Sequence, residues 1–82
     1  MAEKNLNKKV ILSADAPSAI GTYSQAIRVG QFVFISGQIP LDPQTMELVS
    51  DDISDQISQV FRNLSAVCKA SGGDLSNIVK LN

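Results

Sequence analysis

Three short segments of the sequence carry residue types that could contact a ligand or take part in a reaction. Tyr23 follows a glycine-containing turn, where its hydroxyl can donate to or accept from a small molecule. Ser36 and Gly37 end an apolar run, and a hydroxyl beside backbone amides suits a carboxylate or a carbonyl oxygen. Asp51 and Asp52 form a carboxylate pair of the kind that acid–base catalysis uses.

Each of these segments also has a purely structural interpretation. A tyrosine at a strand edge can simply pack its ring, and Gly37 can serve a turn that needs its backbone freedom. Ser36 lacks the glycine-flanked setting of a serine nucleophile, and the chain has no histidine to activate one. Two aspartates directly before an amphipathic run are typical helix caps, so capping is preferred for Asp51 and Asp52. The residues alone predict a small soluble α+β domain with an oxyanion-friendly pocket near Ser36.

The composition excludes several classes of site and partner. With no histidine and one cysteine (Cys68), the 82 residues cannot supply a zinc site or a histidine relay. A lone cysteine and an N-terminus without an apolar signal region predict a cytoplasmic protein. No run approaches the roughly 20 apolar residues of a membrane span. The net charge of −1, with only three clustered lysines (Lys4, Lys8 and Lys9), argues against nucleic-acid binding.

The first half of the chain predicts strands at residues 9–13, 22–29 and 32–36, the last being the strongest. Gly30 and Gln31 separate the second and third strands and predict a two-residue type II′ hairpin. Residues 32–36 are apolar on both faces, so a helix should cover one face and other structure the second. Residues 37–50 predict an irregular segment with a DPQT turn and short extended pieces at 38–41 and 47–49.

One helix is predicted to begin after Asp51 and Asp52 and to stop at Gly72-Gly73. An apolar stripe at helical period should cover the sheet, and its members are Ile53, Ile57, Val60, Phe61, Leu64, Val67 and Cys68. The opposite, polar side is predicted to hold Gln56, Gln59, Arg62, Asn63 and Lys69. Beyond the stop, residues 77–82 (NIVKLN) predict the opening of another strand. We therefore expect a single incomplete domain over residues 1–82, cut off inside that strand.

Two of these segments together resemble the signature of the RidA-type reactive intermediate deaminases, also described as YjgF-like or L-PSP endoribonucleases. They are APSAIGTYSQA at residues 16–26 and FISGQIPLDP at residues 34–43. The helix with QISQVFRNL, the Gly-Gly stop and NIVKLN follow in the family's order, so the resemblance runs from about Val10 to the last residue. It implies an α+β, chorismate-mutase-like fold, with a mixed sheet packed on helices, in a homotrimer whose sites lie between subunits.

The resemblance also implies a reaction and a set of site residues. Members hydrolyse 2-imino acids, such as those derived from 2-aminoacrylate, to 2-oxo acids and ammonia without a metal or organic cofactor. By position, Tyr23 matches the family's site tyrosine, while Ser36 and Gly37 match the strand-end pair beside the ligand. The family's carboxylate-binding arginine and its catalytic glutamate lie beyond residue 82, so no complete catalytic set is expected here. A bidentate arginine is the natural anchor for such a substrate's carboxylate.

Three functions therefore compete. The first is an imine deaminase that is inactive as this 82-residue chain alone. The second is a non-catalytic protein on the same trimeric scaffold that binds small ligands or other proteins. The third is the RNA cleavage suggested by the family's alternative name, against which the acidic isoelectric point of about 5.0 and the lack of a basic stripe argue.

Overall fold

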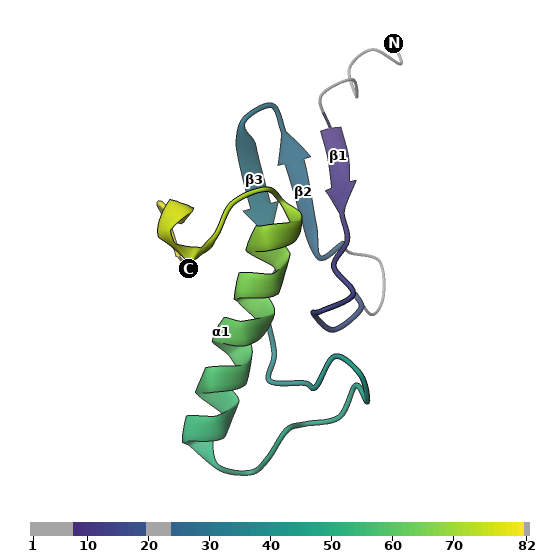
Figure 1. Cartoon of the computed structure of the whole chain (residues 1–82), viewed down its shortest axis with the longest axis vertical. Coiled ribbons are helices and arrows are strands. Elements are labelled where there is room, and N and C mark those ends of the chain that lie inside the picture. The colour runs from purple at the N-terminus through teal and green to yellow at the C-terminus, as the bar shows by residue number, and fades with distance from the viewer. Residues whose placement is uncertain (1–7, 20–23, 82) are drawn as a thin grey trace.

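Three strands and one long helix form the structure of this chain, a computed structural model that describes residues 8–19 and 24–81 (Figure 1). Strands β1 (Lys8–Ile11), β2 (Ala26–Val29) and β3 (Phe32–Ile35) form an antiparallel sheet in that order. Helix α1 (Ile53–Ala70) and the 3-10 helix η2 (Leu75–Asn77) follow. Neither helix of this described part is long and apolar enough to cross a bilayer. The predicted α+β class is confirmed.

The β2–β3 hairpin has the two-residue turn that the sequence predicts. Val29 pairs with Phe32, which leaves only Gly30 and Gln31 between the strands. Gly30 has a φ of +60°, whereas Gln31 does not have a positive φ. This combination is that of a type II′ turn, whose twist matches that of the flanking strands.

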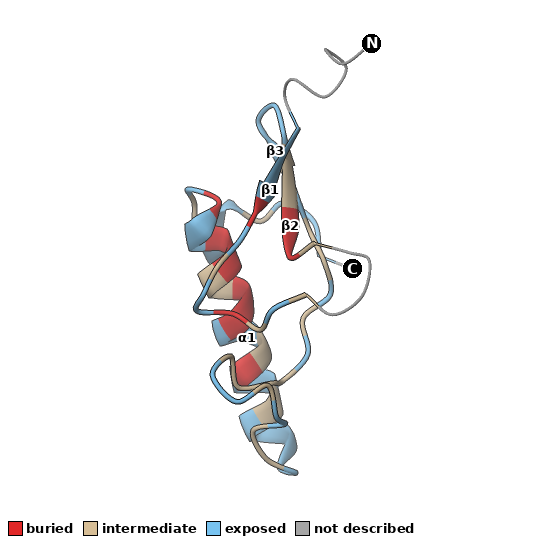
Figure 2. Ribbon diagram, turned by 90° about the vertical axis from the view of Figure 1, so that its right-hand side faces the viewer, coloured by how far each residue is buried: buried red, intermediate tan, exposed pale blue. Residues whose placement is uncertain are grey.

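The core lies between the sheet and the C-terminal half of α1. Ile11, Ala16, Ala26 and Val67 form its buried cluster, and Val33 and Ile35 of β3 pack against it. Figure 2 shows the buried residues on the side of α1 that faces the strands.

The second face of β3 is open in this single chain. Phe32 and Phe34 alternate with the core-facing residues and are 70% and 66% exposed. The prediction that a helix covers one face of residues 32–36 is confirmed. The prediction that other structure covers the second face stays a prediction.

Both ends of α1 carry the caps expected from the sequence. Asp52 is the N-cap, and its carboxylate accepts a hydrogen bond from the Ser54 N–H at 3.1 Å. At the other end Gly72 has a φ of +94°, and the N–H groups of Gly72 and Gly73 donate to the carbonyls of Lys69 and Cys68. This pair of bonds is a Schellman motif, in which glycine accepts the left-handed backbone at low cost. The capping interpretation of the aspartate pair is therefore confirmed for Asp52.

We expect the substitution Asp52→Ala to lower the free energy of unfolding by about 1 kcal/mol, because the first turn of α1 loses its N-cap. The neighbouring Asp51→Ala is the matched control, since Asp51 is exposed and is not the N-cap. Urea unfolding followed by circular dichroism measures both values. Equal losses in the two variants would contradict the assignment of Asp52 as the cap.

The predicted apolar stripe of the helix is wrong in its first half. Ile53, Ile57 and Phe61 are 65%, 52% and 46% exposed, whereas Gln59 and Asn63, predicted to face solvent, are 7% and 0% exposed. The reason is visible in Figure 1, where the N-terminal half of α1 extends past the sheet and lies beside the loop that follows β3. That loop presents the backbone carbonyls of Ile39 and Leu41 to Asn63, so an amide side chain is buried against it.

The strand predicted at residues 77–82 is also corrected. Asn77 ends η2, and residues 78–81 belong to no strand. Local bonds account for the helical turn: Asp74 caps it through the Ser76 N–H, and the Asn77 side chain accepts from the Asp74 N–H. A strand needs a neighbouring strand to pair with, and no part of the described chain pairs with this segment.

Two further expectations are met only in part. The extended pieces predicted at 38–41 and 47–49 reduce to one antiparallel bridge between Leu41 and Leu48. The three described strands pair only antiparallel, so the mixed sheet implied by the resemblance stays a prediction.

Candidate functional site

Ser36 lies directly after β3, at the point where the sheet ends. Its N–H donates to the Gln25 carbonyl at 3.0 Å, and its hydroxyl donates to the Ser24 carbonyl at 2.5 Å. The hydroxyl proton is therefore engaged by the backbone, which leaves the oxygen only as an acceptor. This geometry agrees with the sequence-based view that Ser36 is not a nucleophile. Tyr23, the third predicted site residue, lies outside the described residues.

Gly37 opens a small pocket beside the end of β3. The pocket has a volume of about 20 Å³, and its lining residues are Pro17, Ser18, Ala19, Gln25, Gly37, Gln38, Ile39 and Leu41. Gly37 is exposed, and a Cβ added there would meet no atom within 4 Å. Within residues 8–19 and 24–81, nothing accepts a hydrogen bond from its N–H. The structure thus brings Gly37 together with the 17–19 loop, whereas Ser36 does not line the pocket.

The chemistry that this pocket supports is recognition of a small oxygen-bearing group. A volume near 20 Å³ holds about one water-sized group. An accessible backbone N–H is a suitable donor to a carboxylate oxygen or to an oxygen that gains charge during a reaction. These residues therefore form one edge of a site rather than a complete one.

Gln25 fixes one wall of the pocket from inside. It is 4% exposed, and its side-chain oxygen accepts from the Ser13 N–H at 2.6 Å. Its amide nitrogen donates to the carbonyl of Pro17 at 2.7 Å and lies 3.1 and 3.3 Å from those of Ser13 and Ala16. One carboxamide therefore ties the segment from Ser13 to Pro17 to the start of β2. This role was not predicted from the sequence, although Gln25 lies inside the YSQA part of the first motif.

Asn63 fixes the opposite wall from α1. Its amide nitrogen donates to the carbonyls of Ile39 and Leu41, each at 3.0 Å, and its oxygen accepts from the Gln59 amide at 2.8 Å. Gln59 in turn accepts from the Arg62 guanidinium at 3.2 Å. The sequence pattern predicted that these residues lie on the solvent side of the helix. The sequence feature that could have indicated this pair is the spacing of Gln59 and Asn63, beside the apolar stripe. Side chains four residues apart are neighbours on a helix and can bond each other.

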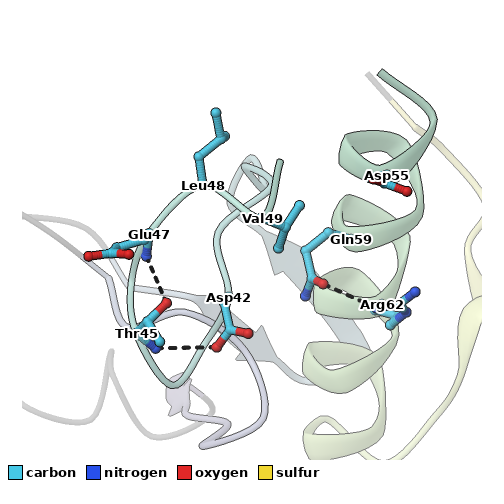
Figure 3. A pocket seen from close by; sticks show the side chains of 8 residues that line it. All are labelled: Asp42, Thr45, Glu47, Leu48, Val49, Asp55, Gln59 and Arg62. Carbon is cyan, nitrogen blue, oxygen red and sulfur yellow. Dashed lines mark hydrogen bonds between the residues drawn. The ribbon is translucent and has the colours of Figure 1, made fainter. Parts of the chain in front are cut away.

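A larger cavity of about 450 Å³ lies elsewhere, between the loop after Leu41 and the first half of α1 (Figure 3). Its lining residues are Asp42, Thr45, Glu47, Leu48, Val49, Asp55, Gln59 and Arg62. The polar groups at its floor already serve the local structure, since the Asp42 carboxylate accepts from the N–H groups of Gln44 and Thr45 at 2.7 and 3.2 Å. Neither Ser36 nor Gly37, the two predicted site residues within the described part of the chain, lines this cavity. We therefore favour the smaller pocket despite its size.

Cys68 is a core residue rather than a nucleophile. It is 4% exposed, and burial, with a smaller contribution from the Asp74 carboxylate, raises the pKa of its thiol. A raised pKa keeps the sulfur protonated, whereas the thiolate is the reactive form. The sequence-based interpretation of Cys68 as core packing is confirmed.

Comparisons with known proteins agree with the fold and with both motifs. The family model described as Endoribonuclease L-PSP matches residues 13–82. A RutC family protein of Pyrococcus horikoshii is 50% identical over 90% of this chain and 59% of its own length. The human protein named 2-iminobutanoate/2-iminopropanoate deaminase is 43% identical over 93% of this chain and 56% of its own. The crystal structure of RidA from an Antarctic Psychrobacter matches with a TM-score of 0.82 at 49% identity, over 87% of this chain and 57% of that one.

The chain thus spans a little under 60% of the length of these relatives. The family match covers all but the first twelve residues and includes both signature segments. We conclude that this chain belongs to the Endoribonuclease L-PSP family, that of the RidA-type reactive intermediate deaminases.

Proposed function

We propose that this chain contributes one side of a site that hydrolyses 2-imino acids to 2-oxo acids and ammonia. The observation that carries the proposal is the exposed backbone of Gly37 at the end of β3, inside a pocket walled by two fixed segments. The identity to a protein named 2-iminobutanoate/2-iminopropanoate deaminase supports the choice of reaction.

The reaction requires few functional groups. Water adds to the imine carbon, a proton passes to the nitrogen, the C–N bond breaks, and ammonia leaves as the carbonyl forms. In the proposed site, the N–H of Gly37 holds an oxygen of the substrate, with the Tyr23 hydroxyl beside it. Ser36 supports Gly37 from outside the pocket, through its bonds to the carbonyls of Ser24 and Gln25. The arginine that anchors the carboxylate and the glutamate that activates water would come from family positions beyond residue 82. No metal or organic cofactor takes part in this scheme.

The proposed site lies between subunits of a homotrimer in the cytoplasm. The open face of β3 supports this arrangement, because Phe32 and Phe34 are 70% and 66% exposed in the single chain. Exposed aromatic pairs on a sheet face are typical of interfaces. A small-molecule partner, rather than a nucleic acid or a membrane, remains our expectation.

A coupled assay tests the reaction. A pyridoxal-phosphate dehydratase generates 2-iminobutanoate from threonine, and the appearance of 2-oxobutanoate is followed. We expect the 82-residue chain alone not to exceed the spontaneous rate. A joined chain, in which residues 1–82 are followed by the C-terminal portion of the Pyrococcus relative, should accelerate the reaction at least tenfold. Acceleration by the 82 residues alone would show that the later arginine and glutamate are not needed.

The variant Gly37→Leu in the joined chain links any activity to the proposed pocket. Because a Cβ at this position meets no atom within 4 Å, the fold should tolerate the leucine side chain, whose bulk beside the Gly37 N–H should hinder the approach of the substrate. We expect at least a tenfold loss of rate with an unchanged unfolding midpoint. Full activity in this variant would place the site elsewhere. A folded but inactive unmodified joined chain would favour the non-catalytic binding function.

A further inference from the structure

We propose that Asn63 is a positioning residue for the pocket at Gly37. Its carboxamide, oriented by Gln59, fixes the backbone of residues 39–41 as the pocket wall opposite to the segment that Gln25 holds. The inference rests on the proposed function for its ligand, whereas the clamp itself rests only on the contacts within this chain.

The contacts of Asn63 use its side chain completely. Both amide hydrogens are directed at carbonyls two residues apart, those of Ile39 and Leu41, each at 3.0 Å. The oxygen is held by the Gln59 amide at 2.8 Å, so the carboxamide cannot flip without losing these bonds. Asn63 is fully buried, and an amide with unpaired groups would be costly there.

The clamped segment has little else to fix it. Ile39 is 52% exposed, and Pro40 and Leu41 are only half-buried. The Ile39 carbonyl also accepts from the Leu41 N–H at 2.8 Å, which makes a tight three-residue turn, and the Pro40 carbonyl accepts from the Val49 N–H at 3.1 Å. The bond to Val49 and the bridge to Leu48 join this segment only to its own loop, so the two bonds from Asn63 are what tie it to α1.

Two buried amides thus hold the two walls of one pocket. Gln25 ties the loop from Ser13 to Pro17 to β2, and Asn63 ties Ile39 and Leu41 to α1. Gly37 lines the same pocket as residues of both walls. Small displacements of a positioning group can reduce rates by about 100-fold. The spacing between the walls would therefore determine how well a small acid fits beside the Gly37 N–H.

Hydrogen exchange of the 82-residue chain with the substitution Asn63→Asp tests the clamp. A carboxylate of the same shape cannot donate to Ile39 or Leu41. We expect the N–H groups of Asp42 and Val49, which anchor this wall, to exchange faster by a factor at least ten times that of the N–H of Val67 in α1, whose own change reports the general loss of stability. At about pH 4 the introduced carboxyl is partly protonated and regains one donor, so part of the wall's protection should return. Local release should restore protection mainly at Asp42 and Val49, whereas recovery from a general loss of stability would restore protection equally at Val67.

The matched control is Gln56→Glu. It removes another amide-to-carbonyl bond from α1, in which Gln56 donates to the Ser50 carbonyl at 2.9 Å, away from the pocket. We expect the exchange rates of the Asp42 and Val49 N–H groups in this variant to stay within twofold of those in the unmodified chain. If Asn63→Asp does not fold, Gln59→Met, which frees the orientation of Asn63 without removing its donors, should speed wall exchange about threefold. Unchanged wall exchange in whichever variant folds would overturn the proposal.

The effect of Asn63 on activity is measured in the joined chain. At a temperature where both proteins are fully folded, Asn63→Asp should lower kcat/KM at least tenfold, whereas Gln56→Glu should stay within twofold. Faster amide exchange at Asp42 and Val49 with an unchanged kcat/KM would overturn the positioning role and show that Asn63 has a structural role only. If the unmodified joined chain is inactive while Asn63→Asp still speeds amide exchange at Asp42 and Val49, the proposed function is contradicted. The structural role of Asn63 in holding residues 39–41 is then still supported.

Discussion

Replacing Val67 by aspartate is expected to lower the free energy of unfolding of this chain by at least about 3 kcal/mol at neutral pH. Val67 is fully buried and joins α1 to Ile11, Ala16 and Ala26. An unpaired buried charge costs at least about 3 kcal/mol, and a domain of this length holds only roughly 4–12 kcal/mol. Thermal and urea unfolding followed by circular dichroism measure the result.

The control for this prediction is Phe61→Asp, which makes a similar change on the same helix. Phe61 is 46% exposed in the single chain, so its charge stays in contact with water. We expect a loss below about 1 kcal/mol, as is usual for surface positions. Equal damage from the two substitutions would contradict the burial pattern of α1 and show that its first half is covered in solution.

Replacing Gln25 by leucine is expected to lower the free energy of unfolding by about 3 kcal/mol. The shorter apolar side chain removes the partner of the Ser13 N–H and of the carbonyls of Ala16 and Pro17. Each buried polar group that loses its partner costs about 1–3 kcal/mol. Water that reaches the loosened loop can bond some of these groups and so reduces the total cost. Urea unfolding measures the loss, and the amide shift of Ser13 reports the release of the loop.

The same substitution at Gln44 provides the comparison. Gln44 is exposed, and its described hydrogen bond uses its backbone N–H rather than its side chain. We expect Gln44→Leu to change stability by less than about 0.5 kcal/mol. If Gln25→Leu proved equally mild, the carboxamide would not be what holds the Ser13–Pro17 loop.

Local sequence signals predicted the parts of the fold that short-range interactions determine. Gly30 and Gln31 predicted the hairpin because only two residues separate strongly apolar runs. Asp52 and Gly72 predicted the helix ends because their effects act within one turn. The position of Gly37 at the rim of a pocket was also predictable, since a strand end followed by glycine exposes its backbone amides.

Contacts between distant segments were not predictable in the same way. Gln59 and Asn63 follow a polar pattern in the sequence, and nothing nearby shows that the loop 24 residues before Asn63 offers carbonyls to bury them against. The stripe at Ile53, Ile57 and Phe61 has helical period, but period alone cannot say which part of a helix extends past a sheet. Residues 77–82 have strand-forming composition, yet a strand forms only where a partner is available.

The two-residue turn at Gly30 and Gln31 also bears on how the chain folds. The hairpin of β2 and β3 closes almost without loop entropy, whereas β1 must be brought back across the 14 residues between Ile11 and Ala26. The hairpin should therefore form first, within microseconds, and serve as the template on which β1 docks. The side-chain hydrogen bonds from Gln25 to Ser13 and Pro17 would then form last, once this loop has returned to the sheet.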